Sequence, residues 1–181
     1  MIQAISQEIQ FLVNCSGDSH ITKLYESFIQ GNKLFVVMEY LGGGSVKEAV
    51  SRCGGSLKEV FIAIIIREVL LGVEFLHSKG KIHRDIKCAN ILLAVNGEVK
   101  LADFGVSAQL SDSICKRSTI AGTPCWMAPE IIIDNTYDAK CDLWSVGISA
   151  IEMAQGEPPY ANLKPMETFM ALHYAPSPTL A

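Results

Sequence analysis

The sequence predicts a mixed α+β fold in one domain, and two observations carry this prediction. Stretches rich in β-branched and aromatic residues come early in the chain, whereas the longest apolar stretches of helical length come later. The chain has 181 residues, enough for one ordinary domain with a hydrophobic core. Its composition, 49% hydrophobic and 19% charged, argues against a largely disordered chain.

Charge and cysteine usage argue against several classes of function. The 15 lysines and arginines and 19 aspartates and glutamates give a net charge of −4, so we expect no nucleic-acid partner. The six cysteines include no CxxC pair and no cluster with histidine at zinc-ligand spacing. We therefore expect reduced thiols in the cytosol or nucleus, with the cytoplasm as the expected location.

The apolar stretches do not resemble targeting or membrane segments. The first residues, MIQAISQEIQ, lack the basic start and apolar centre of a signal peptide. The most apolar run, residues 61–76, contains Arg67, Glu68 and Glu74. Charges at these positions argue against a membrane span, so we expect no membrane partner.

The first predicted element is a helix over residues 2–13. Its apolar residues recur at helical spacing, at Ile2, Ile5, Ile9 and Leu12. At 100° per residue, Glu8 falls on the same side of this helix. A carboxylate on the inward side needs a partner.

A two-strand hairpin follows. Residues 21–29 and 33–41 are rich in β-branched and aromatic side chains and flank the turn residues QGN. The sequence GGGS then breaks the pattern, and Ser45 is suited to cap the N-terminus of a short helix.

The next predicted elements are a long helix and a second strand pair. Residues 57–78 are apolar on enough sides to predict a buried helix, which ends before Gly80. Residues 89–93 and 98–102 read as two short strands, because Asn96-Gly97 between them is a strong turn signal.

The last third begins with a polar, turn-rich stretch over residues 103–130, which is too long for a connection without a function. Residues 141–154 then predict another buried helix, which the sequence GEPP ends.

Three motifs carry the chemistry. HRDIKCAN at 83–90, DFG at 103–105 and APE at 128–130 occur in this order. Together they resemble the signature set of eukaryotic protein kinases, which implies an α+β, protein-kinase-like bilobal fold. The resemblance implies a small-lobe remainder with helix αC, strands and hinge over 1–41, and a helical large lobe over 42–181. It places an activation segment at 103–130.

The resemblance assigns roles within these motifs. Asp85 is similar to the catalytic base that orients the acceptor hydroxyl, and Lys87 to the lysine that contacts the transferring phosphate. Asn90 and Asp103 are similar to the oxygen ligands of Mg²⁺, and His83 to a structural histidine. Taken alone, an Asp or Asn in a loop more often forms a turn or a cap, but the joint occurrence of the motifs favours the catalytic interpretation.

The resemblance also implies an ATP site. Met38 matches the gatekeeper, Glu39 and Leu41 would offer backbone groups to adenine, and Leu92 would lie beneath the ring. The alternative for the apolar residues is ordinary core packing. Glu8 matches a glutamate that pairs with a lysine on an upstream strand.

Details of the motifs resemble serine/threonine kinases of the sterile-twenty-like group, in its germinal-centre branch. Lysine two positions after Asp85 and the sequence GTPCW indicate this class, and Thr123 would bridge Asp85 and Lys87. Thr119 aligns with the activating phosphosite, with Ser118 as a rival acceptor. Arg84 would grip the phosphate. An upstream kinase or trans-autophosphorylation would add this phosphate. The alternative is that Thr119 is an ordinary exposed loop residue.

Some family parts are not found in the sequence. No glycine-rich loop or VAIK-type lysine precedes Glu8, and no arginine that would pair with Glu130 follows it near the end. An unpaired buried carboxylate is costly, so we expect low stability and little activity of this chain alone.

Two functional hypotheses follow. The first is an ATP- and Mg²⁺-dependent kinase that transfers the γ-phosphoryl group to serine or threonine hydroxyls of protein substrates in signalling. The second is a truncated, catalytically inactive interaction module. The intact catalytic positions favour the first hypothesis.

Overall fold

A computed structural model of the protein describes residues 17–31, 33–103, 108–109, 122–133 and 138–180. Short sheets and helices alternate along these residues, which confirms the predicted α+β class. The strands are β1 (Leu24–Gln30), β2 (Lys33–Met38), β3 (Gly44–Ser45), β4 (Lys81–Ile82), β5 (Ile91–Leu93), β6 (Val99–Leu101) and β7 (Ala108–Gln109). The helices are α2 (Val46–Arg52), α3 (Glu59–Ser78), α4 (Pro129–Ile133), α5 (Lys140–Gln155) and α6 (Pro165–Tyr174), with 3-10 turns η1 (Cys88–Asn90) and η2 (Pro124–Trp126).

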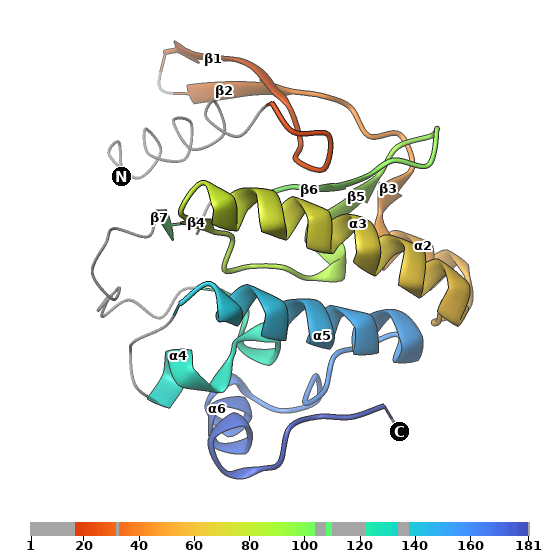
Figure 1. The fold of residues 1–181 in the computed structure, drawn as a ribbon, viewed down its shortest axis with the longest axis vertical. Helices are drawn as coiled ribbons and strands as arrows, with labels where there is room; N and C mark the ends of the chain where they lie inside the picture. The colour runs from red at the N-terminus through yellow and green to blue at the C-terminus, as the bar shows by residue number, and fades with distance from the viewer. Residues whose placement is uncertain (1–16, 32, 104–107, 110–121, 134–137, 181) are drawn as a thin grey trace.

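The elements form successive layers. Figure 1 shows the β1–β2 hairpin at one end, α3 and α5 in the middle, and α4 and α6 at the other end. The three-stranded sheet β3-β5-β6 lies between the hairpin and α3, and β4 pairs with β7. None of the helices in the described part of the chain has the length and apolarity that crossing a membrane requires.

The hairpin forms as the sequence predicts. Strands β1 and β2 are antiparallel, and Phe28 is opposite Phe35 with the two rings stacked at 5.2 Å. Gly31 adopts φ +61°, a left-handed conformation that glycine reaches without steric cost.

The predicted cap of the short helix is also confirmed. The Ser45 side chain accepts a hydrogen bond from the Glu48 N–H at 3.2 Å, and the Glu48 carboxylate accepts one from the Ser45 N–H at 3.0 Å. This reciprocal capping box satisfies two N–H groups that the start of α2 would otherwise leave unpaired.

The long helix α3 begins at Glu59, two residues later than predicted, and ends at Ser78 as predicted. Its burial differs from the prediction. Ile65, Val69 and Leu76 lie on a buried face against β6 and α5, whereas Phe61 is 53% exposed and Ile64 is 50% exposed. The prediction of a buried rather than amphipathic helix is therefore wrong, because elements in the described part of the chain cover one face of α3 and leave Phe61 and Ile64 exposed.

The strands β5 and β6 confirm the second predicted pair. Gly97 adopts φ +90°, and the Ala94 N–H donates to the Glu98 carbonyl at 2.8 Å across the turn. The segment before β1 joins this sheet, because the Thr22 N–H donates to the Leu101 carbonyl at 2.9 Å.

Helix α5 confirms the predicted buried helix and completes the core. It ends at Gly156, whose φ of +89° allows its N–H to donate to the Glu152 carbonyl. A Cβ at Gly156 would lie 2.5 Å from the Gly55 carbonyl oxygen, so this close approach requires glycine. The main core joins α2, α3, α5 and the sheet through buried Val46, Val50, Ile65, Val69, Val73, Leu76, Ile86, Ile91, Leu101, Val146 and Met153.

Several predictions fall outside the described residues. These are the helix over 2–13 with Glu8, and the activation-segment residues Ser118 and Thr119.

Candidate active site

The segment from His83 to Asn90 is held by a buried carboxylate on α5. Asp142 is fully buried and accepts hydrogen bonds from the N–H of His83 at 2.9 Å and the N–H of Arg84 at 2.8 Å. His77, in the last turn of α3, donates from Nε2 to the same carboxylate at 2.8 Å. The two backbone bonds hold Arg84 at φ +67°, a conformation that non-glycine residues rarely adopt.

His83 is a buried structural residue, as the sequence suggested. The Asp85 N–H points to its Nδ1 at 3.3 Å, so Nδ1 is the acceptor, and Nε2 then donates to the Ala102 carbonyl at 3.2 Å. Burial lowers the pKa of His83 below its ordinary value despite opposing charges from Asp142 and Asp85. The neutral tautomer with its proton on Nε2 satisfies both ring nitrogens.

Three side chains close a triangle at the end of this segment. Lys87 Nζ donates to Asp85 Oδ2 at 2.7 Å and to Thr123 Oγ1 at 2.8 Å. Thr123 Oγ1 in turn donates to Asp85 Oδ1 at 2.7 Å. Thr123 immediately precedes η2, so the triangle joins two segments that are separated by 38 positions in sequence.

The triangle determines the ionisation of Asp85. Burial acts to raise its pKa, but hydrogen bonds from Lys87, Thr123 and Asn90 and the charge of Lys87 outweigh burial and leave the pKa below its ordinary value. Asp85 is therefore an ionised hydrogen-bond acceptor at neutral pH.

The Asn90 side chain contacts Asp85, and Asp103 follows close by along the backbone. Asn90 Nδ2 donates to the Asp85 carbonyl at 2.8 Å and to its Oδ2 at 3.0 Å, which turns the Asn90 amide oxygen away from these two contacts. The Ala102 N–H donates to the Asn90 carbonyl at 2.9 Å, which brings the next residue, the exposed Asp103, near Asn90. Asp103 adopts φ +62°. An amide oxygen and a carboxylate are hard donors, so this pair fits Mg²⁺.

The segment after β2 has two backbone groups that make no hydrogen bond within the described part of the chain. The Glu39 N–H donates to the Lys23 carbonyl at 2.9 Å, and the Leu41 carbonyl accepts from the Gly44 N–H at 3.2 Å. Within the described part of the chain, the Glu39 carbonyl and the Leu41 N–H remain as an acceptor and a donor.

The apolar residues of the predicted ATP site lie around this segment. Met38 ends β2 and packs against the main core, so its predicted alternative of core packing also applies. Leu92, in the middle of β5, pairs with Ser45 of β3 and Lys100 of β6.

Sequence reasoning missed two buried acids that hold the site. Asp142 is one, and Glu152 is the other: its Oε2 accepts from the Cys88 N–H at 3.0 Å and from Trp126 Nε1 at 3.0 Å. Ser149, between them on the same face of α5, contacts the Ile86 carbonyl at 3.5 Å. A signal existed, because a carboxylate within a helix that is predicted to be buried must have partners.

The remaining predicted residues lie close to this framework. Arg84 is half-buried beside Asp142, and Glu130 is half-buried in the first turn of α4. Glu130 is partly exposed as a residue, whereas the expectation took its carboxylate to be buried, and the low stability of this chain alone stays a prediction.

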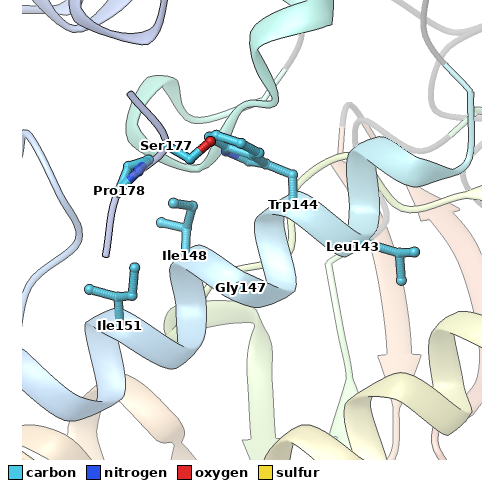
Figure 2. Close-up of a pocket in the computed structure, with 7 residues that line it drawn as sticks. All are labelled: Leu143, Trp144, Gly147, Ile148, Ile151, Ser177 and Pro178. Carbon is cyan, nitrogen blue, oxygen red and sulfur yellow. The ribbon is translucent and has the colours of Figure 1, made fainter. Parts of the chain in front are cut away.

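A cavity of about 180 Å³ lies away from the triangle (Figure 2). Residues of α5 form one wall and Ser177 and Pro178 cover the other. At 100° per residue, Trp144, Gly147 and Ile151 lie on the face of α5 opposite Ser149, which faces the catalytic segment. The cavity is therefore separate from the candidate active site.

One comparison places the chain among known proteins. Residues 1–175 match the family model that is described as the protein kinase domain. The match spans every described element of the candidate active site.

Proposed function

This chain belongs to the protein kinase domain family, and from that membership we propose that it transfers the γ-phosphoryl group of ATP to serine or threonine hydroxyls of protein substrates. The observation that carries the proposal is the closed triangle of Asp85, Lys87 and Thr123, with 2.7–2.8 Å between its polar atoms. Phosphoryl transfer needs a positioned acceptor and cations near the phosphate more than covalent chemistry. In the triangle, Asp85 would position the acceptor hydroxyl and Lys87 would supply a cation near the phosphate.

Asp85 receives the acceptor hydroxyl. Its lowered pKa keeps it ionised, so it accepts a hydrogen bond from the hydroxyl and orients the oxygen towards the phosphate. Because its basicity is low, it takes the proton late, as the bond to phosphorus forms. Lys87 places its ammonium group beside Asp85 Oδ2, where it can neutralise charge on the transferring phosphate.

Asn90 and Asp103 would hold Mg²⁺ in this proposal. When bound, the ion neutralises charge on the phosphate oxygens. The hydrogen bonds from Asn90 Nδ2 to Asp85 fix the amide, so that its oxygen is left to face the ion.

The segment after β2 would read the adenine base. Adenine presents a donor at its amino group and an acceptor at the adjacent ring nitrogen, which complement the Glu39 carbonyl and the Leu41 N–H. Met38 would close the back of the site and Leu92 would lie beneath the ring.

The preference for serine and threonine rests on Thr123, together with Lys87 two positions after Asp85. The similarity to the sterile-twenty-like group, with Thr119 or Ser118 as an activating phosphosite that Arg84 grips, belongs to the same proposal. The proposal also includes a pairing of Glu8 with a strand lysine and a place for Thr123 and Glu130 in the substrate loop. It further includes activation by an upstream kinase or by trans-autophosphorylation, and a cytoplasmic location.

Transfer of ³²P from γ-labelled ATP to a serine- and threonine-containing protein tests the proposal. We expect Asp85→Asn to lower the rate by roughly a hundredfold to ten-thousandfold, the usual contribution of a positioned base. The matched control is Asp138→Asn, because Asp138 is an exposed aspartate outside the triangle.

The same assay separates the second hypothesis. A wild-type chain that binds the protein substrate but neither binds ATP nor transfers more phosphate than Asp85→Asn would support the interaction module. Incorporation on tyrosine alone would contradict the proposed serine and threonine specificity.

A further inference from the structure

A lysine in the middle of β6 is buried where lysines are rarely found. Lys100 is 9% exposed, and its ammonium donates to Glu39 Oε2 at 2.8 Å, with Glu98 Oε2 at 3.6 Å. A buried ammonium group persists only when close carboxylates compensate its lost hydration. The Lys100–Glu39 pair is therefore a specific contact rather than one of many surface ion pairs.

The partner of Lys100 is the residue whose carbonyl would receive adenine. Glu39 Oε1 accepts the Lys23 N–H at 2.6 Å, and the Glu39 N–H donates to the Lys23 carbonyl at 2.9 Å. With the bond from Lys100, three hydrogen bonds hold Glu39 through its side chain and its backbone. They restrict the rotation that would turn the Glu39 carbonyl away from a ligand.

Lys100 also belongs to the floor of the same site. It pairs with Leu92 across the β5–β6 ladder, and Leu92 is the residue proposed to lie beneath the base. The position of Lys100 is thereby fixed by the floor strand, while its ammonium fixes the segment that meets the edge of the base.

We propose that Lys100 is a positioning residue that sets the preference for adenine over guanine, an inference that rests on the proposed function. Lys100 acts through Glu39, because its ammonium donates to the Glu39 carboxylate. Guanine presents an acceptor where adenine presents its amino donor, so the Glu39 carbonyl rejects guanine only while it is held in place. Loss of the ion pair loosens the carbonyl, which weakens ATP binding more than GTP binding.

The test measures displacement of a fluorescent ATP analogue from the full chain by ATP and by GTP. We expect Lys100→Met to weaken ATP binding by roughly tenfold, inside the range found for residues of one hydrogen-bond network, and to leave GTP binding nearly unchanged. Lys100→Arg keeps the cation and should restore most of the preference. Lys140→Met is the matched control, because Lys140 is an exposed lysine 3.9 Å from Asp138.

A second variant covers the case in which Lys100→Met does not fold. Glu39→Gln keeps the acceptor for the Lys23 N–H and the whole backbone but removes the charge that attracts Lys100. It should lower the ratio of ATP to GTP affinity as well. Circular dichroism at the assay temperature shows which variants are folded.

The outcomes distinguish this inference from the proposed function. If the wild-type chain binds ATP and folded Glu39→Gln keeps the wild-type ratio of ATP to GTP affinity, the inference is overturned and the proposed function stands. If the affinities for ATP and for GTP fall by the same factor in every folded variant of Lys100 and Glu39, Lys100 has a structural role only. That result also overturns the inference. A wild-type chain that binds neither nucleotide overturns the proposed function and the inference with it.

Discussion

Thr123 Oγ1 donates a hydrogen bond to Asp85 Oδ1 at 2.7 Å and accepts one from Lys87 Nζ at 2.8 Å. One hydroxyl therefore uses both its donor and its acceptor capacity within the candidate active site. Thr123→Val keeps the shape of the side chain and removes both bonds, whereas Thr123→Ser keeps the hydroxyl.

We expect Thr123→Val to raise the pKa of Asp85, because a hydrogen bond to the charged form is lost. It should also lower kcat for phosphoryl transfer by roughly tenfold to a hundredfold. Carboxyl ¹³C NMR of Asp85 and the transfer assay measure the two effects. If Thr123→Val and Thr123→Ser behave alike in both, the hydroxyl has no part in the site.

The neutral, buried His83 predicts a pH dependence of stability. Its pKa in the folded state lies below the ordinary value, so below about pH 6.5 the unfolded chain binds a proton that folded His83 does not. The free energy of unfolding should therefore fall as pH decreases from 7.5 to 5.5, by at most about 1.4 kcal/mol per pH unit from this group.

Urea unfolding at several pH values tests this dependence in the wild type and in His83→Gln. Glutamine does not titrate, so the variant should be less stable at pH 7.5 but show a flatter profile. His173→Gln is the control, since His173 is exposed. An unchanged slope in His83→Gln would show that other groups cause the pH dependence.

Glu152 links the segments that contain Cys88 and Trp126 to α5. Its removal in Glu152→Ala would leave the Trp126 indole N–H and the Cys88 N–H buried without their acceptor. We expect a loss of about 3 kcal/mol in the free energy of unfolding, the typical cost of leaving buried polar partners unpaired. Urea denaturation measures it, and the exposed Glu157 provides the control Glu157→Ala. Equal stability of the two variants would contradict this role.

Substitution by alanine at two helix glycines, Gly72 and Gly147, should change the stability of the protein in opposite directions. A Cβ at Gly72 would lie 3.2 Å from the His20 Cβ and 3.2 Å from Leu101 Cδ1, whereas a Cβ at Gly147 would meet nothing within 4 Å. Gly72→Ala should destabilise the protein by about 1–3 kcal/mol through overpacking between α3 and β6. Gly147→Ala should stabilise it by up to about 1 kcal/mol, because alanine favours the helix.

Thermal unfolding compares the two glycine variants directly. Stabilisation by Gly72→Ala would mean that the segment around His20 does not pack on α3 as closely as the structure indicates.

The sequence predicted those parts of the fold that depend on local chemistry. The hairpin turn, the Ser45 cap and the Asn96-Gly97 turn each depend on residues within a few positions, and each formed as expected. The triangle of Asp85, Lys87 and Thr123 was also predicted, but only through the resemblance to protein kinases.

Features that depend on distant partners were not predictable in the same way. Apolar composition makes α3 a helix but does not say which face a neighbour covers, so the exposure of Phe61 and Ile64 was missed. Asp142 was missed because its partners, His83 and Arg84, lie 59 and 58 positions away in sequence. Helix α6 was not predicted either.

The face of α5 that carries Asp142, Ser149 and Glu152 has a consequence for hydrogen exchange. The amide protons of His83, Arg84 and Cys88 point into carboxylates on this helix, although residues 83–87 form neither helix nor strand. Such protons meet solvent deuterium only when the segment separates from α5. These three amides should therefore exchange as slowly as those in the centre of α5, so that an irregular segment shares the opening reaction of the helix behind it.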